Sequence, residues 1–114
     1  MASAFDLGQG YGQFLAASEA AFAAGHYEVA YHALMAALHC AEQAADTDRL
    51  EEVAQVARRH QQALDAQSPS HRLSSQSSAQ RGHRSVFEAG AVTAESARKR
   101  LEAAKVLERL RPPR

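Results

Sequence analysis

Residues 11–66 read YGQFLAASEAAFAAGHYEVAYHALMAALHCAEQAADTDRLEEVAQVARRHQQALDA, and this stretch decides the fold. Its apolar residues recur every three or four positions, the spacing that buries one face of an α-helix. We expect a first helix from Tyr11 that ends at Gly25, because glycine readily takes the left-handed conformation of a helix terminus. A second helix should follow over about 27–45 and a third over about 49–66. The stretch therefore predicts an all-α fold built from an antiparallel helical hairpin and a third helix.

The break between the second and third helices is rich in side chains that cap helices. Asp46, Thr47 and Asp48 stand there in succession. Asp48 is followed three positions later by Glu51, which resembles a capping box with Asp in place of Ser or Thr. We therefore expect Asp48 to cap the third helix.

Length and composition place the chain among small single-domain proteins. It has 114 residues, of which 46% are hydrophobic, with six per cent aromatic and no tryptophan. Much of the apolar content is alanine, which buries little area per residue, so the helices must approach closely to form a core. The single cysteine, Cys40, excludes an intrachain disulfide. The first 25 residues lack Lys and Arg, unlike a signal peptide, and we expect a cytoplasmic protein.

The sequence on either side of this stretch differs in composition. Residues 1–10 contain two glycines and are predicted to be a flexible leader. Residues 67–85 are rich in serine, carry three arginines and are nearly free of large apolar side chains, so we expect a flexible basic linker over 67–92. A basic amphipathic helix is predicted within 93–114; it begins at residue 93 or 94, ends near Leu110, and is stopped by the prolines that follow.

The formal net charge of zero hides a strong asymmetry between the halves of the chain. Residues 1–66 carry a charge of −6 and residues 67–114 carry +6. Such a separation predicts an electrostatic partner, which could be the other half of the same molecule, a second copy, or an acidic surface such as nucleic acid.

The stretch 11–66 resembles the tetratricopeptide repeat family over about one and a half repeats. The resemblance lies in small residues where two helices would cross, in a turn with glycine, and in large residues beside them. The small residues are Ser18, Ala30 and Ala37, the turn is the segment 24–30, and the large residues are Phe14 and Leu34. Ala17 and Ala21 depart from the pattern, since the family favours Leu and an aromatic there. Glu42 stands where the family has a helix-ending proline.

The resemblance implies a non-enzymatic protein-interaction or adaptor module. Members of the family receive a peptide in a groove lined mainly by the first helix of each repeat. Transferred to this chain, the partner-binding candidates are Gln13, Phe14, Ala17 and Glu19 on the first helix and Arg49, Glu52 and Arg59 on the third. The family's carboxylate-clamp function needs Lys and Asn residues that this acidic half lacks, so it is not transferred.

No motif in the sequence predicts a reaction, a metal site or a cofactor. His32 and His39 lie seven positions apart, about 10 Å along a helix, which is too far for both to ligate one ion. Cys40 has no predicted base within reach, since the neighbouring His39 points about 100° away round the helix. We therefore expect a protein that is not an enzyme.

The basic C-terminal region supports a second hypothesis. The five basic side chains chosen as candidates are Arg98, Lys99, Arg100, Lys105 and Arg109. They predict, as the alternative function, a nucleic-acid-associated accessory protein that neutralises phosphates through this tail. The same helix could instead dock its stripe of Leu101, Ala104 and Leu107 on the acidic hairpin of its own or another copy, which would give self-association. Its apolar face is narrow and lacks Trp and Phe, so we expect no membrane binding.

Overall fold

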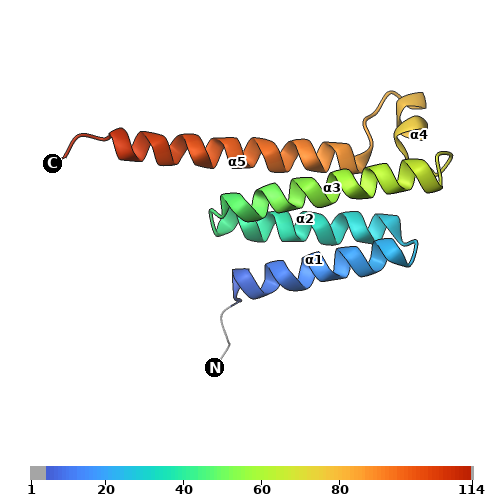
Figure 1. Ribbon diagram of the computed structural model, residues 1–114, viewed down its shortest axis with the longest axis horizontal. Coiled ribbons are helices and arrows are strands. Elements are labelled where there is room, and N and C mark those ends of the chain that lie inside the picture. Colours follow the sequence, from blue (N-terminus) through green and yellow to red (C-terminus); the bar gives the residue numbers. More distant parts are fainter. Residues whose placement is uncertain (1–4, 114) are drawn as a thin grey trace.

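Side-chain caps and glycine turns divide the chain into helices. The structure is a computed structural model that describes residues 5–113, and within that range it contains helices and no strand. The helices are α1 (Leu7–Ala23), α2 (Tyr27–Gln43), α3 (Thr47–Gln67), α4 (Ser75–Gln80) and α5 (Val86–Leu110) (Figure 1). The predicted all-α fold is confirmed.

Helix α1 begins four residues before the position predicted from the sequence. The side chain of Asp6 accepts a hydrogen bond of 2.9 Å from the backbone N–H of Gln9, which caps the first turn. This cap offsets the cost of the glycines that suggested a flexible leader. The ring of Phe5 lies so close to Gly10 that an added Cβ would be 2.3 Å from it. The predicted leader is therefore wrong from residue 5 onward, and residues 1–4 lie outside the described range.

The turn between α1 and α2 follows the prediction. Gly25 has a φ of +82°, and the N–H of His26 bonds back to the carbonyl of Ala21 at 2.8 Å. Where the two helices cross, the Ser18 hydroxyl donates to the Ala30 carbonyl at 2.7 Å, and both residues are fully buried. Small side chains thus bring the two backbones together, as helix-on-helix packing requires.

Helix α3 begins earlier than predicted because a different aspartate caps it. Asp46, and not Asp48, accepts the hydrogen bond from the Arg49 backbone N–H, at 3.1 Å. The preceding residue, Ala45, takes a φ of +53° and so reverses the chain without a glycine. The prediction placed the cap two residues too late.

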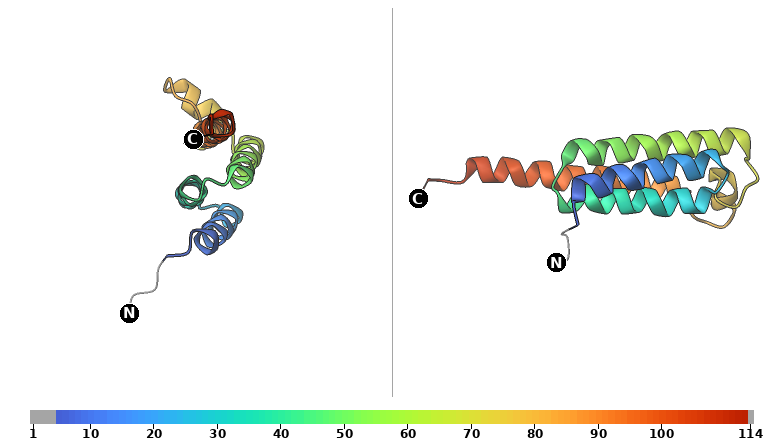
Figure 2. Two further views of the ribbon diagram at one scale, coloured as in Figure 1. Left: turned by 90° about the vertical axis from the view of Figure 1, so that its left-hand side faces the viewer. Right: turned by 90° about the horizontal axis from the view of Figure 1, so that it is seen from below.

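The four long helices stack side by side as an open array. Helix α1 packs on α2, α2 on α3, and α3 on α5, and the molecule measures 59 × 39 × 18 Å (Figure 1). Viewed along the helices, α1 and α3 lie on the same side of α2 (Figure 2). The core between them is formed by leucine, valine and alanine, with Leu34, Leu38, Leu50 and Val53 fully buried.

The segment 67–92 is structured, which corrects the prediction of a flexible linker. It contains α4 and the first turns of α5, and the side chain of Phe87 is completely buried. The serine hydroxyls hydrogen-bond within the protein: Ser74 donates to the Pro69 carbonyl at 2.6 Å, and the Asp65 carboxylate accepts from the N–H and hydroxyl of Ser75. Because these bonds satisfy buried polar groups, a serine-rich segment can be ordered.

Helix α5 begins at Val86, not at residue 93 or 94, and its two halves have different surroundings. Gly90 lies inside α5, where an added Cβ would be 2.8 Å from the end of the Met35 side chain. Glycine there lets α5 approach α2 closely. The described residues from Glu102 onward are all exposed, and this end of α5 projects past the other helices (Figure 1).

Candidate functional site

Side chains of α1 and α3 meet along the side of the array that these two helices share. The Tyr11 hydroxyl donates to the Glu52 carboxylate and lies 3.2 Å from the Arg49 carbonyl oxygen. The Arg49 guanidinium lies 4.9 Å from the centre of the Tyr11 ring. We call this contact the α1–α3 seam, and its members are Tyr11, Glu19, Phe22, Arg49, Glu52, Arg59 and His60.

A charged pair stands at the surface of the seam. Arg59 donates to the Glu19 carboxylate at 3.2 Å, and the two side chains are 61% and 48% exposed. An exposed pair of this kind contributes about 0–1 kcal/mol to stability. It can therefore exchange its partner for another charge at little cost to the fold.

The phenol of Tyr11 is held in its neutral form. Burial raises the pKa of Tyr11, and the hydrogen bond to Glu52 and the negative charge of Glu52 raise it further. The hydroxyl therefore acts as a fixed hydrogen-bond donor that ties the first half of α1 to α3.

His60 is buried in the seam among aromatic rings. Its ring stacks on Phe22 at a centroid distance of 4.1 Å and meets the edge of Phe87 at 5.5 Å. The nearest Glu19 oxygen is 3.9 Å from Nε2, which is too long for a hydrogen bond. Neither ring nitrogen has a hydrogen-bond partner among the described residues. Burial lowers the pKa of His60; the charge of Glu19 opposes this shift and that of Arg59 adds to it.

The structure brings together four of the seven residues chosen from the family resemblance. Glu19 and the three candidates on α3 all lie in the seam, as described above. Phe14 is half-buried and packs against the core. Gln13 and Ala17 are exposed, but at about 100° per residue Ala17 lies some 160° round α1 from Glu19. The α1 candidates therefore do not share one face.

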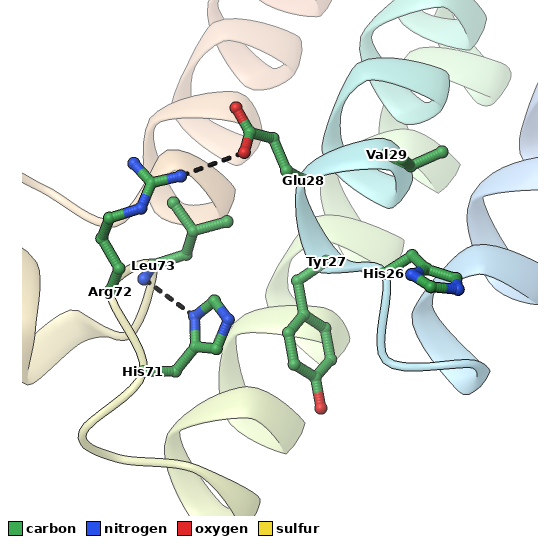
Figure 3. A pocket seen from close by; sticks show the side chains of 7 residues that line it. All are labelled: His26, Tyr27, Glu28, Val29, His71, Arg72 and Leu73. Carbon is green, nitrogen blue, oxygen red and sulfur yellow. Dashed lines mark hydrogen bonds and ion pairs between the residues drawn. The ribbon is translucent and has the colours of Figure 1, made fainter.

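A small cavity lies at another place, which the sequence did not indicate. It has a volume of about 280 Å³ and lies between the start of α2 and the loop after α3 (Figure 3). At its rim Arg72 donates to Glu28 at 3.0 Å, and the Leu73 backbone N–H donates to Nδ1 of His71. The residues that line it are His26, Tyr27, Glu28, Val29, His71, Arg72 and Leu73. Arg72 and Glu28 are 44 positions apart in the sequence, so no local pattern could have indicated that residues 71–73 lie beside α2.

The basic candidates of the tail have two kinds of surroundings. Arg98 pairs with Glu102 at 3.1 Å, and Arg100 reaches Glu42 at the end of α2 at 3.5 Å. Lys99, Lys105 and Arg109 are exposed and make no ion pair with a described residue.

Within residues 5–113 the structure contains no cluster of three or more His, Cys, Asp or Glu side chains that could hold a metal ion. Cys40 is buried in the core. None of the described helices is both long and apolar enough to span a bilayer.

Comparisons with family models, curated proteins and solved structures found no match for this chain.

Proposed function

We propose that this protein is a non-enzymatic interaction module that binds a peptide or helical segment of another protein across the α1–α3 seam. The observation that supports this proposal is the position of α1 and α3 on one side of the array, with the Glu19–Arg59 pair exposed between them.

The chemistry of the seam suits a partner that carries charges of both signs. The side chains of Glu19 and Arg59 are about half exposed or more, and each can pair with an opposite charge on an incoming segment. Beneath them, Phe22 and His60 form a packed aromatic layer that would hold the two helices at a fixed spacing. A preformed surface of this kind lowers the ordering cost of binding.

The full chain should be used to test this proposal, because α5 completes the core with α3. The chain is immobilised and exposed to nuclease-treated host lysate, and captured proteins are quantified for wild type, Arg59→Glu and Lys99→Glu. Lys99 is a matched control, since it is an exposed base on α5 away from the seam. We expect Arg59→Glu to reduce capture of specific partners about tenfold or more and Lys99→Glu to leave it unchanged. Equal capture by Arg59→Glu would contradict the proposal.

The alternative function, binding of nucleic acid through the tail, rests on Lys99, Lys105 and Arg109, which are exposed and form no ion pair with residues 5–113. It gives the opposite pattern when the capture is repeated with lysate that has not been treated with nuclease. Capture would require intact nucleic acid, would fall in Lys99→Glu but not in Arg59→Glu, and would weaken steeply as salt is raised.

A further inference from the structure

The projecting end of α5 carries large apolar side chains on the side that faces away from the rest of the molecule. Leu107 and Leu110 are 69% and 73% exposed, and Val106 is 42% exposed. With Ala103 they form an i, i+3, i+4, i+7 stripe, the spacing of a helix-packing face. We call these four residues the overhang stripe.

The overhang stripe does not continue the buried face of the same helix. The buried face follows Phe87, Ala94 and Ala97 toward Leu101. At about 100° per residue, the mean direction of the overhang stripe is nearly opposite to that line. The helix therefore changes its apolar side close to residue 102, and the body of its own molecule cannot cover the new side.

On one flank of the stripe the charges are complementary to those of the same segment in the reverse direction. On the other flank an antiparallel copy brings Arg111 level with Arg100, and each of these bases already pairs with an acid of its own chain, Glu108 and Glu42. Glu102 and Arg109 are seven positions apart, two turns, so both lie on one flank of α5. If a second copy runs antiparallel with its Leu101 opposite Leu110, then its Glu102 lies opposite Arg109. Leu101 only marks the level here, since it faces its own core; by symmetry the Glu102–Arg109 contact forms twice, as in an isologous interface.

We propose that residues 101–110 of α5 pair antiparallel with the same residues of a second copy. The contact buries the overhang stripe and forms two reciprocal Glu102–Arg109 ion pairs. In the single chain Arg109 makes no ion pair with a described residue, while Glu102 pairs only with Arg98.

The charge of Arg109 also favours a partner outside its own molecule. Arg100 pairs with Glu42 at the acidic end of α2, so α5 passes that end of α2 near residue 100. Arg109 lies nine residues further, about 14 Å along the helix. This exceeds the Debye length of about 8 Å at physiological salt, so the molecule's own acidic side chains at that end are screened from it.

The interface is small, since only about ten residues of each copy take part. It falls below the roughly 800 Å² per partner that a standard stable complex buries. We therefore expect a dimer that dissociates on dilution, with a dissociation constant of about 10–100 µM. This proposal is independent of the α1–α3 seam and of the function proposed for it.

Sedimentation equilibrium of the full chain from about 10 to 500 µM tests the apolar part of the contact. We expect wild type to pass from monomer to dimer over this range. Leu107→Glu/Leu110→Glu should remain monomeric with an unchanged unfolding midpoint at low concentration, because both side chains lie outside the core. A monomeric wild type at 500 µM, or a dimer that survives the double substitution, would overturn the proposal.

The charge pairs give a second measurement, which tests the antiparallel register itself. Arg109→Glu should weaken the dimer about tenfold, because two favourable pairs become two repulsive ones. Glu102→Arg/Arg109→Glu should restore the affinity to within about threefold of wild type. Arg84→Glu, a change of an exposed base far from the overhang, should have no effect. Equal weakening by Arg84→Glu and Arg109→Glu, or no recovery in the double variant, would exclude this register.

Discussion

The two halves of α5 bury and expose opposite kinds of side chain. In the packed half, residues 86–101, the positions that meet the other helices are mainly small, and Ala91, Ala94 and Ala97 are almost completely buried. In the overhang, residues 102–110, leucine and valine side chains are largely exposed. Burial in this helix therefore follows the position of its neighbours and not the size of the side chain.

The contrast shows how an alanine-rich protein forms a core. Small residues let the backbone of α5 lie close to α3, and many short contacts replace the large side chains of an ordinary core. The exception is Phe87, which is completely buried and contacts Phe22 of α1, Tyr31 of α2 and His60 of α3. The packed half thus depends on one large residue and a line of small ones.

The largest expected effect on this contrast comes from removing that one residue. Phe87→Ala should lower the free energy of unfolding by about 3–5 kcal/mol, because it leaves a cavity among the aromatic rings. Leu107→Ala, an apolar truncation in the overhang, should change it by about 0.5 kcal/mol or less when measured in dilute protein. Urea unfolding followed by circular dichroism measures both values.

Similar losses in the two variants would contradict the division of α5 into a packed and a free half. The slope of the unfolding free energy with urea is a control, since it should stay equal in wild type and in both variants if each remains a two-state folder.

A smaller effect is expected from acid, which should act through His60 of α3, the ring that packs against Phe87 of the packed half. The pKa of His60 is lowered in the folded protein because the ring is buried against Phe22 and Phe87. Below about pH 6.5, the ordinary histidine value, the unfolded chain takes up a proton that the folded chain does not. The free energy of unfolding should therefore fall as the pH drops from 7.5 through 6.5.

Two substitutions identify the residue responsible for this pH dependence. His60→Phe keeps an aromatic ring in the stack and should flatten the dependence between pH 7.5 and 5.5. His39→Gln changes an exposed histidine on α2 and should leave it unchanged. The assignment to His60 would be wrong if stability stayed constant over this range or if His60→Phe kept the full slope.

Sequence patterns with a local cause predicted the course of α1, α2 and α3, although they placed the starts of α1 and α3 too late. The helical period, Gly25 as the terminus of α1, and the small pair Ser18 and Ala30 at the helix crossing were all predicted and are all present. Each of these depends on residues close together in the chain or on the steric needs of a single turn.

The later part of the fold depends on contacts that are distant in sequence. The segment 67–92 looked disordered because its serines offer no apolar surface. Its order comes from Asp65, which holds the start of α4, and from the pocket that receives Phe87. In the candidate site, Glu19 and the three α3 residues lie together in the seam. Gln13 and Ala17 do not, because their positions on the helical wheel point away from it.

Hydrogen–deuterium exchange in dilute protein tests the division of α5 most directly. At about 1 µM, where the proposed dimer is dissociated, amides of residues 90–101 should exchange at least about a hundredfold more slowly than those of residues 104–110, because only the packed half is held by tertiary contacts. Equal protection along the whole of α5 at this concentration would contradict the account.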